Sequence, residues 1–499
     1  MLLREAVREL DYELVKGSLD IPVSGIAHDS RHVRQGDVFV AIPGFTVDGH
    51  RFVPQAVAAG AGAVVVGKPM DIREDVTVIR VADTRRAMAV LASNFFGRPT
   101  EQLNLIGITG TNGKTSISYF IRSIYEQAHR SIGVIGTIGT LIGGQLRKNK
   151  NTTPESLELQ NIFAEMVDAG IMNCVMEVSS HALSLDRVAC CEFDMAIFTN
   201  LTPDHLELHR TMDEYFNAKA KLFEMTKGVH IINVDDPYGR RLLDRAGSSA
   251  AKVVTYGIGW RADIRPDVWA ENIELAADHT TYTAHTPFGS VKVKVRLPGN
   301  IYVYNSLAAI ACACMDGIPL SDISAGIESV EGIRGRMEVV YQDEHYRAIV
   351  DFAHTEDGLE KAIETIRPFT KGRVIVVFGV YAAPGELGLS KRRGMGKTAA
   401  RLADLSIVTS DNPKMQDPQA IIADVSAAIE EHGGQYVAIV DRAEAIRYAV
   451  DVCEPGDCIL VAGKGHETTQ IIGTEEIPFH EAEIIRERFA VKQRMNVRS

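Results

Sequence analysis

The sequence predicts an α/β protein of three domains, the last of them a Rossmann-like, doubly wound sheet. The chain has 499 residues, and single hydrophobic cores stop growing near about 250–300 residues. Short apolar runs alternate with helical stretches, as strands and helices do in α/β folds. The segment at 95–104, which contains Gly and Pro, is interpreted as a linker, and a third unit begins around GIRGRMEVV at 332–340. We therefore expect domains at 1–97, 98–331 and 332–499.

The order of these runs predicts the first two domains. Residues 38–42 and 63–67 are apolar and flank the helical run VPQAVAAG, which indicates a small strand–helix–strand unit. The second domain opens on a buried strand, LIGITG, which leads through a turn into the helical stretch KTSISYFIRSIYEQA. Its remaining elements are expected to be strands at 173–180, 194–200 and 229–235, a hairpin within 264–296 and a helix at 306–317.

The third domain continues the alternation of strands and helices. Its predicted strands are YRAIVDF, GRVIVVFG, LSIVTS, YVAIV and CILVAGKG, and a helical stretch separates each strand from the next. This pattern is typical of a doubly wound sheet, whose ligands bind at the carboxyl ends of the strands.

Composition excludes several classes of protein. Hydrophobic residues make 45% of the chain and charged residues 24%, which is typical of a globular protein. The formal net charge is −12, so the chain lacks the basic character that a nucleic-acid backbone requires, although backbone amides can bind phosphate locally. We find no run of about 18 apolar residues and no signal-peptide core, so we expect no membrane span. Seven cysteines without a C-x-x-C pair favour a reduced, cytoplasmic location.

The strongest chemical signal is a glycine-rich turn between a strand and a helix, Gly107-Ile-Thr-Gly110-Thr-Asn-Gly113-Lys114-Thr115. Glycines let backbone amides approach phosphate oxygens, Lys114 can neutralise the β- and γ-phosphates, and Thr115 can offer its hydroxyl to Mg²⁺. We therefore predict a P-loop-type ATPase sheet in the central domain. In the common motif four residues separate the first Gly from Gly-Lys. Here five residues separate Gly107 from Gly113, and two separate Gly110 from Gly113. The alternative is a turn that merely exposes a lysine.

Two further motifs end predicted strands. The run from Glu177 to His181 ends the strand predicted at 173–180, and a carboxylate at the carboxyl end of a strand points into the ligand crevice, where its oxygens suit Mg²⁺. A surface glutamate followed by a serine helix cap is the alternative. The run NLTPDHLELH begins at Asn200, and one of its histidines, His205 or His209, is either a metal ligand or a hydrogen-bonded loop residue.

Lys219 and Lys221 lie two residues apart on a predicted helix, so they cannot share one face. One is expected to be solvated while the other points inward. An inward lysine would repel a metal ion unless its charge were altered. Carbamylation by CO₂ would turn it into an anionic oxygen ligand.

Other segments place polar residues at strand ends or helix starts. Asn305 either caps a helix or reads a base edge with its amide. Arg336 can meet a phosphate, and Asp351 can hold a ribose hydroxyl. The segments Asp411-Asn412-Pro413-Lys414 and Gly463-Lys-Gly-His-Glu467 follow strands of the third domain and could grip a small zwitterion in one crevice. Singly, each is more often a turn.

Together these residues give the chain a resemblance to the Mur ligases. GITGTNGKT, NTTPES, EVSSHAL, NLTPDHLELH, GRME, DFAHTEDGLEK, DNP and GKGHE occur in the order found in that family, and the similarity spans nearly the whole chain. The N-terminal run DSRHVRQGDVFVAIPGFTVDGH is similar to the UDP-binding domain of the family. The chain most resembles the members that add the third amino acid to UDP-N-acetylmuramoyl-L-alanyl-D-glutamate.

The resemblance implies a UDP-sugar-binding domain, a central ATPase domain and a C-terminal domain that carries the incoming amino acid. It implies an ATP- and Mg²⁺-dependent ligase that forms an amide bond through an acyl phosphate, in peptidoglycan precursor synthesis. Its partners would be UDP-N-acetylmuramoyl-dipeptide and a free amino acid, with no nucleic acid, and the enzyme would be a cytoplasmic monomer. The alternatives are a paralogue that joins another amino acid or acceptor in a secondary-metabolite pathway, and a non-catalytic nucleotide-binding protein.

The resemblance also implies residue roles. Those implied for catalysis are Lys114, Glu177, His205 and Lys219. Those implied for ATP are Gly110, Thr111, Asn112, Gly113, Lys114, Thr115, Ser116, Asn305, Arg336, Asp351 and His354. Those implied for the UDP substrate are Ser30, Thr152, Thr153, Ser179 and Arg187, and for the amino acid Asp411, Asn412, Pro413, Lys414, Gly463 and Glu467. One Mg²⁺ would lie near Thr115 and Glu177, and another near His205 and a carbamylated Lys219.

Several departures from the family bear on the substrate. The family usually has Gly-Gly-Asp-Arg-Asp after the VFG strand, whereas this chain reads GVYAAPGEL, with Leu387 near the place of the arginine. Lys414 stands where diaminopimelate-adding members have Arg and lysine-adding members often have Ala. A cation there disfavours a side chain that ends only in an ammonium, so meso-diaminopimelate is the first choice. Leu185 and Glu356 replace a common Gln and Pro, which suggests an altered acceptor.

Overall fold

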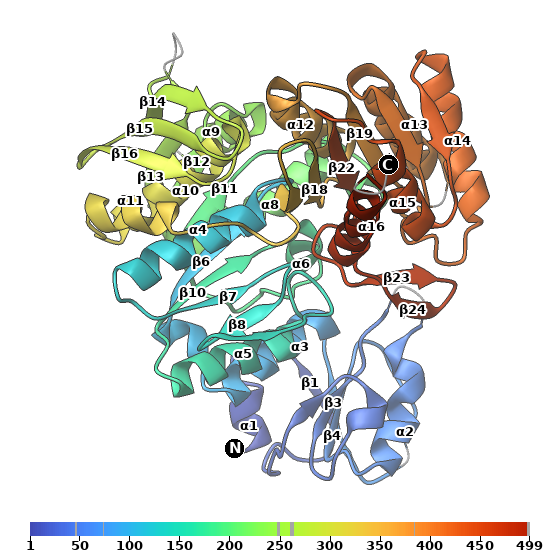
Figure 1. Ribbon diagram of the computed structural model, residues 1–499. Helices are drawn as coiled ribbons and strands as arrows, with labels where there is room; N and C mark the ends of the chain where they lie inside the picture. Colours follow the sequence, from blue (N-terminus) through green and yellow to red (C-terminus); the bar gives the residue numbers. More distant parts are fainter. Residues whose placement is uncertain (45–46, 73, 247–249, 260–263, 384, 497–499) are drawn as a thin grey trace.

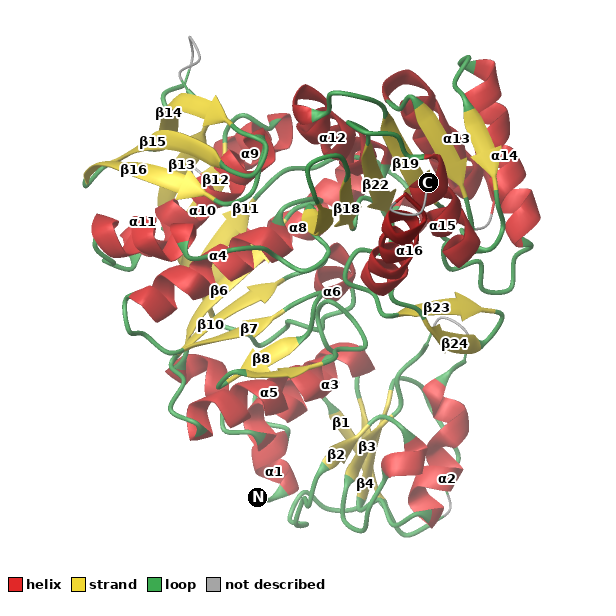
Figure 2. Cartoon of the chain, viewed as in Figure 1, coloured by secondary structure: helices red, strands yellow, loops and turns green. Residues whose placement is uncertain are grey.

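The computed structural model describes residues 1–44, 47–72, 74–246, 250–259, 264–383 and 385–496. Within them the chain forms three lobes, each built on one large β-sheet, in order along the sequence (Figure 1). Helices cover the sheets (Figure 2). The predicted third domain ends in residues 497–499, which lie outside the described part.

The N-terminal lobe is a five-stranded sheet of order β1-β5-β4-β3-β2, parallel except where β1 pairs with β5. Its elements are β1 (Glu13–Lys16), β2 (Ile26–Ala27), β3 (Val38–Val40), β4 (Ala63–Val66), β5 (Thr77–Arg80), α1 (Leu3–Ala6), α2 (Val53–Ala58) and α3 (Thr84–Phe95), with short 3₁₀ turns at Ser30–His32 and Gly49–Phe52. β3 and β4 are buried throughout because α1 and α3 pack on one face and α2 on the other. The predicted strand–helix–strand unit is therefore confirmed.

The central lobe is an eleven-stranded sheet of order β16-β15-β14-β13-β12-β11-β6-β10-β7-β8-β9. Its strands are β6 (Asn104–Thr109), β7 (Ile132–Ile135), β8 (Thr140–Ile142), β9 (Gln145–Arg147), β10 (Asn173–Glu177), β11 (Phe193–Phe198), β12 (Thr226–Asn233), β13 (Lys252–Gly257), β14 (Val268–Leu275), β15 (Thr280–Thr286) and β16 (Gly289–Val295). The strands from β14 to β7 run parallel, and antiparallel strands extend both edges. β15 and β16 form the predicted hairpin.

Helices cover both faces of this sheet. They are α4 (Lys114–Gln127), α5 (Ser156–Asp168), α6 (Ser180–Ser184), α7 (Leu206–His209), α8 (Met212–Met225), α9 (Pro237–Ala246), α10 (Asn300–Met315) and α11 (Leu320–Glu328). Residues of β6 alternate between two cores: Leu105 packs with α5 and α8, whereas Ile106 and Ile108 pack with α4 and α10. The predicted linker at 95–104 holds the end of α3 and a 3₁₀ turn at Pro99–Gln102.

The C-terminal lobe is a six-stranded sheet of order β17-β18-β22-β19-β20-β21, parallel except for β17. Its elements are β17 (Glu338–Gln342), β18 (Arg347–Asp351), β19 (Val374–Phe378), β20 (Leu405–Val408), β21 (Tyr436–Ala438), β22 (Cys458–Ala462), α12 (Glu356–Ile366), α13 (Gly385–Leu402), α14 (Pro418–Glu431), α15 (Arg442–Val452) and α16 (Glu481–Asn496), with a 3₁₀ turn at Arg367–Phe369 and a separate hairpin of β23 (Thr469–Ile472) and β24 (Glu475–Pro478). Alternate residues of β19 pack against α12–α14 and against α15 and α16. The doubly wound sheet is confirmed.

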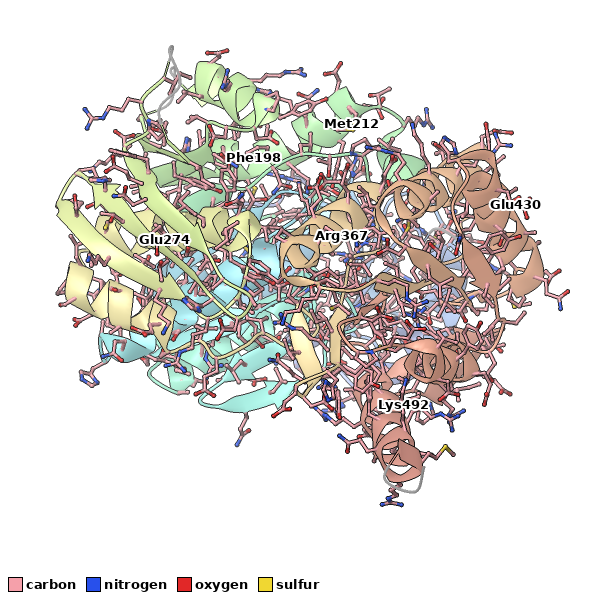
Figure 3. The ribbon with its side chains drawn as sticks, turned by 45° about the horizontal axis from the view of Figure 1, so that its top comes forward. Phe198, Met212, Glu274, Arg367, Glu430 and Lys492 are labelled. Atoms are coloured by element: carbon pink, nitrogen blue, oxygen red, sulfur yellow. The ribbon has the colours of Figure 1, made fainter. Side chains whose placement is uncertain are left out.

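Burial separates the core from the surface as the patterns predict. Phe198 at the end of β11 is 1% exposed, whereas Glu274 on β14 and Glu430 on α14 are exposed near opposite ends of the molecule (Figure 3). All seven cysteines are described, and each is a free thiol; Cys190 is exposed and the other six are buried. Among the described helices, none combines the length and apolar character needed to cross a bilayer.

Candidate functional site

The glycine-rich turn joins β6 to the N-terminus of α4. Gly110 has φ 142° and Gly113 has φ 91°, a backbone region that favours glycine. A Cβ on Gly110 would lie 1.9 Å from Thr199 Oγ1, and one on Gly113 would lie 2.4 Å from Asn305 Oδ1. The turn therefore needs glycine at both positions. It leads into a 14-residue helix whose first amides have no partner within the helix and can face an anion.

Glu177, the last residue of β10, is 1% exposed. Thr115 Oγ1 and the Thr137 amide donate to its Oε1, each over 2.9 Å, and the Thr137 hydroxyl donates to Oε2 over 3.0 Å. Arg336 of the C-terminal lobe donates to Thr115 Oγ1 over 3.0 Å. Thr115 and Glu177 thus form a set of oxygen atoms of the kind that Mg²⁺ prefers.

Two lysine side chains converge on one carbonyl oxygen. Lys114 Nζ donates to the Gly110 and Thr111 carbonyls over 2.9 and 2.8 Å, and Lys219 Nζ donates to the Gly110 carbonyl over 2.8 Å. Burial lowers the pKa of Lys114, and burial together with the Lys114 charge holds the pKa of Lys219 well below its usual value. Lys219 is 2% exposed, whereas Lys221 is on the surface. The prediction that one lysine points inward while the other is solvated is confirmed.

Three basic groups surround the carboxylate of Asp204, which lies in the loop after β11 and is 7% exposed. His205 Nε2 lies 3.3 Å from its Oδ2, Lys391 Nζ 3.5 Å from its Oδ1 and His354 Nε2 3.9 Å from its Oδ2. Burial alone would raise the pKa of Asp204, but the charges of these three partners hold it well below its usual range. Because Lys391 and His354 belong to the C-terminal lobe, Asp204 joins two lobes at this point.

A histidine cluster surrounds His205. Ligand atoms of His181, His205 and Glu207 lie within 4.8 Å of one another, and His205 Nδ1 is 3.3 Å from Glu207 Oε1. Burial and the neighbouring His205 and His209 lower the pKa of His181 to about 4. His181 therefore stays neutral near pH 7, the form in which imidazole binds a metal.

Arg336 and Asp351 lie where the C-terminal lobe meets the turn. Asp351, the last residue of β18, accepts hydrogen bonds from the amides of Met337 and Ala353 over 2.7 and 2.8 Å. Burial raises the pKa of its carboxyl. The Arg336 guanidinium lies 4.7 Å from the ring centroid of Phe352. A molecule bound here would meet the Arg336 guanidinium, the Phe352 ring and the Asp351 carboxylate.

Asn305 has a different place from the one that a helix cap requires. Helix α10 begins at Asn300 with Gly299 as its N-cap, so Asn305 lies in the second turn. The interpretation of Asn305 as a cap is wrong, because the helix starts five residues earlier. Its side-chain amide instead lies against Gly113 of the glycine-rich turn.

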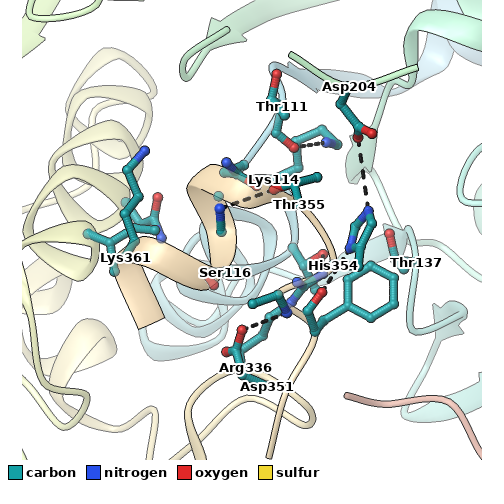
Figure 4. A pocket seen from close by; sticks show the side chains of 18 of the residues that line it. Thr111, Lys114, Ser116, Thr137, Asp204, Arg336, Asp351, His354, Thr355 and Lys361 are labelled. Atoms are coloured by element: carbon teal, nitrogen blue, oxygen red, sulfur yellow. Dashed lines mark hydrogen bonds and ion pairs between the residues drawn. The ribbon is translucent and has the colours of Figure 1, made fainter. Parts of the chain in front are cut away.

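One cavity of about 240 Å³ joins these groups between the central and C-terminal lobes. The predicted residues that line it are Thr111, Asn112, Gly113, Lys114, Thr115, Ser116, Thr152, Glu177, Ser179, His205, Lys219, Asn305, Arg336, Asp351 and His354. Figure 4 shows side chains of the turn and α4 on one side and Arg336, Asp351 and His354 on the other. Most residues predicted to bind the nucleotide or to act in catalysis therefore share one cavity.

Four of the five residues predicted for the UDP substrate lie together beside Glu177. The Thr153 hydroxyl donates to the Glu177 carbonyl over 2.8 Å and accepts from the Ser179 amide over 3.1 Å. Arg187 donates to the Thr153 carbonyl over 3.1 Å and forms an ion pair with Glu155 at 2.9 Å. Thr152 Oγ1 lies 3.2 Å from the Thr137 hydroxyl beside the carboxylate.

Ser30 is the member of that set which the structure keeps apart. It lies in the N-terminal lobe, is 7% exposed and donates to Gln55 Oε1 over 3.0 Å. Arg85 of the same lobe reaches Glu155 at 3.5 Å, so one ion pair connects that lobe to the Arg187 group. The arrangement suits a long molecule that spans both lobes.

The residues predicted for a zwitterion form a second group in the C-terminal lobe. Lys464 is 0% exposed and donates to Asn412 Oδ1 over 3.0 Å and to Glu467 Oε2 over 2.7 Å. Asp411 Oδ1 lies 3.9 Å from the same ammonium group, and Asn412 also donates to Glu467 over 3.1 Å. Lys414 is exposed, with φ 51°. Pro413 and Gly463 lie within the same two loops.

Sequence reasoning missed several members of these groups. Thr137, Asp204, Lys361 and Lys391 were not assigned roles, yet the first three line the cavity and Lys391 contacts Asp204. Asp204 could have been found from the sequence, since it lies in the run NLTPDHLELH after β11. Lys391 had none, because it is 187 residues from Asp204 in the sequence.

The fold and this site define a three-lobed α/β architecture in which a glycine-rich turn of the kind that binds phosphate faces a C-terminal Rossmann-like lobe. Three family models match the chain: Mur ligase family, catalytic domain, at residues 22–96; Mur ligase middle domain at 108–313; and Mur ligase, glutamate ligase domain, at 335–465. The chain belongs to the Mur ligase family.

Relatives and solved structures agree along almost the whole chain. A protein of Alkaliphilus metalliredigens named UDP-N-acetylmuramoyl-L-alanyl-D-glutamate--2,6-diaminopimelate ligase is 44% identical over 487 residues, covering 98% of this chain and 97% of that protein. A protein of the same name from Clostridium perfringens is 43% identical over 489 residues, covering 97% and 99%. A solved structure with that ligase name has a TM-score of 0.69 at 29% identity and covers 99% of both chains.

We expect the variant His354→Gln to lose less folding stability than the parent when the pH is lowered. Burial and the Lys391 charge, opposed by Asp204, lower the pKa of His354 to about 4, below the value of about 6.5 in an unfolded chain. Between these two pH values only the unfolded state binds the proton, so stability falls as pH falls from about 6.5 to about 4. Melting temperatures measured across this range should depend less on pH in the variant. His32→Gln, at a histidine 80% exposed, is the control, and an unchanged slope in His354→Gln would contradict the assignment.

Proposed function

We propose that this chain is an ATP-dependent ligase that joins meso-diaminopimelate to UDP-N-acetylmuramoyl-L-alanyl-D-glutamate in peptidoglycan precursor synthesis. The observation that carries the proposal is the position of Glu177, whose buried carboxylate meets Thr115 of the glycine-rich turn on one side and the Thr153–Ser179 group on the other. A nucleotide on the turn and a substrate on that group would therefore meet at one point. The names of the relatives give the same reaction.

The nucleotide would lie along the cavity with its phosphates at the start of α4. Backbone amides of the turn and Lys114 would bind the β- and γ-phosphates, Arg336 would add a second cation, and Asp351 would accept a ribose hydroxyl. Asn305 would read the base with its amide. The threonine hydroxyl and glutamate oxygens at 115 and 177 fit one Mg²⁺, which when bound would neutralise phosphate charge.

The chemistry follows from the poor reactivity of a carboxylate toward an amine. Transfer of the γ-phosphoryl group to the substrate carboxylate breaks the bond to ADP and creates an acyl phosphate with a good leaving group. The deprotonated amine of the incoming amino acid then attacks the carbonyl carbon, and phosphate leaves as the amide forms. Lys114 and the helix N-terminus would stabilise the charge on the transferring group.

Lys219 would act as a carbamate. Its pKa is held well below the usual value by burial and by Lys114, so a neutral amine, the form that attacks CO₂, is accessible. The amine adds to the carbon of CO₂ and loses one proton, which leaves an anionic oxygen ligand. Together with His205 it would complete a second Mg²⁺ site, which an ammonium could not do.

The two ends of the substrates would bind in different lobes. Thr152, Thr153, Ser179 and Arg187 would hold the muramoyl-peptide and Ser30 the uridine end. The loops at 411–414 and 463–467 would take the free amino acid, with Glu467 toward an ammonium and Lys414 toward the distal carboxylate. Because each lobe supplies one substrate site, a cytoplasmic monomer would suffice.

One observation favours a second candidate, a paralogue that joins a different amino acid or acceptor. The arginine-bearing motif of the family is absent, and Leu387 near its place is 43% exposed on α13. Leu185 and Glu356 add two further departures. A genome neighbourhood of wall genes would favour the first proposal, and a biosynthetic cluster the second.

A screen with purified protein tests the proposed function. ATP, the UDP-muramoyl-dipeptide and one amino acid at a time are mixed, and the release of ADP and phosphate is followed while the product is weighed by mass spectrometry. Release with diaminopimelate and a product heavier by diaminopimelate less one water is the expected result. Absence of release with every amino acid tested would sink the proposal.

Lys219→Ala should lower kcat by about 10²-fold or more, because it removes a group beside the transferring phosphoryl group. Lys221→Ala, two residues away on the exposed side of the same helix, is the matched control and should change kcat by less than about twofold. The carbamate adds a second readout: activity of the parent should fall in CO₂-free buffer and return with bicarbonate. Equal activities of the two variants would contradict the role given to Lys219.

Lys414→Ala should raise KM for diaminopimelate by about 10- to 100-fold, since a hydrogen bond to a charged group contributes about 1.5–3 kcal/mol. Lys414→Arg should bind at least as well as the parent because it keeps the cation and adds a bidentate geometry. Steady-state kinetics with diaminopimelate and lysine provide the measurement. If Lys414→Ala leaves KM unchanged, the distal carboxylate is bound elsewhere.

A further inference from the structure

The two loops of the proposed amino-acid site leave the sheet from strands that are not neighbours. Asp411 follows β20 after a two-residue extension, Gly463 follows β22 directly, and β19 lies between these strands. At a spacing of about 4.8 Å per strand, the loops begin about 10 Å apart. Contacts outside the ladder can therefore help to set their relative position.

Arg442 makes one such contact, in addition to those of Lys464 and Gln470. Its guanidinium donates to the Ser410 carbonyl over 3.4 Å through Nη1 and to the Ala462 carbonyl over 2.8 Å through Nη2. These carbonyls belong to the residues directly before Asp411 and Gly463. A Cβ on Gly463 would lie 2.8 Å from Asp411 Oδ2 and 3.8 Å from Arg442 Nη2, so the loops and the guanidinium are closely packed.

The position is a costly one for a cation. Arg442 is 1% exposed and is the first residue of α15, where the helix dipole disfavours positive charge. Glu481, 3% exposed at the start of α16, compensates by accepting from Arg442 Nε over 2.7 Å. Its other oxygen, Oε2, has no hydrogen-bond partner among the described residues. A buried ion pair is by itself weak evidence of a contribution to folding stability. The carbonyls of Ser410 and Ala462, which Arg442 contacts, give the pair a second role.

We propose that Arg442, held by Glu481, is a positioning residue that fixes the loops at 410–414 and 463–467 relative to each other, so that Asp411 and Glu467 face one amino acid. This inference rests on the proposed function of the two loops. Lys464 joins their side chains, and Arg442 joins their main chains. A planar guanidinium can reach two carbonyls and a carboxylate at once, whereas a lysine ammonium on one flexible stem cannot hold all three at this spread.

The same sheet offers a matched control at its other end. Arg373 binds Asp457 through Nε and Nη2 over 3.0 and 2.7 Å and donates to the Val452 carbonyl over 2.8 Å. This pair lies at the amino ends of β19 and β22, away from the loops. Arg373→Lys therefore disturbs an arginine–carboxylate pair of the same lobe, with a more exposed arginine, without touching the proposed site.

The experiment compares Arg442→Lys, Glu481→Gln and Arg373→Lys in the full chain. Arg442→Lys should raise KM for diaminopimelate about 10-fold or more, while KM for ATP and for the UDP substrate changes less than about twofold. Glu481→Gln, which keeps the arginine and an acceptor oxygen, should give a smaller rise in the same direction and serves if Arg442→Lys does not fold. Arg373→Lys should leave all three KM values unchanged. An unchanged KM for diaminopimelate in both site variants, or an equal rise in Arg373→Lys, overturns the proposal.

Hydrogen exchange separates this inference from the proposed function. In the protein without substrates, amides at 410–414 and 463–467 should exchange faster in Arg442→Lys than in the parent and in Arg373→Lys. That result needs no ligase activity, so it decides the positioning role even if no amino acid is ligated. Equal exchange in these loops across the three proteins would refute it.

Discussion

The site depends on the parallel pairing of β10 with β6. In this register Glu177 lies beside Ile108, one residue before β6 ends and the glycine-rich turn begins. A carboxylate buried to this degree must find donors or a cation, and the turn supplies one donor in Thr115 while Thr137 supplies two. The strand pairing therefore determines where the oxygen atoms, the phosphate-binding amides and the neighbouring substrate group can meet.

The C-terminal lobe completes this arrangement rather than merely adjoining it. Arg336 reaches Thr115 at 3.0 Å, and Asn112 of the turn donates to Asp357 over 2.7 Å. Hydrogen bonds that include groups expected to contact the nucleotide therefore join the C-terminal lobe to the turn. A ligand that inserts among these groups must compete for them, so its binding would change the hydrogen bonds that join the two lobes.

The sequence could predict those parts of the site that lie next to a local pattern. Lys114 follows a strand and a glycine-rich turn, and Glu177 ends an apolar run, so their positions follow from chain order alone. The cap alternative for Asn305 was wrong because the helix begins at Asn300, five residues earlier, with Gly299 as its N-cap. Lys391 and Arg442 could not be found in this way, since their partners are brought near by packing of distant elements and neither lies in a recognisable motif.

The charges in the cavity explain how an acidic chain with a net charge of −12 can present a site for a polyanion. Lys114 and Lys219 share the Gly110 carbonyl, and burial together with the Lys114 charge holds the pKa of Lys219 well below its usual value, so a charged inner lysine is disfavoured. The proposed carbamate would resolve the conflict, because it replaces the inner cation with an anion. Lys114 would then keep its proton for the phosphates, and the inner position would gain an oxygen ligand. One modification would thereby serve both the nucleotide and the metal. The electrostatic reason for it, burial beside the Lys114 charge, exists at the inner Lys219 and not at its solvated neighbour Lys221.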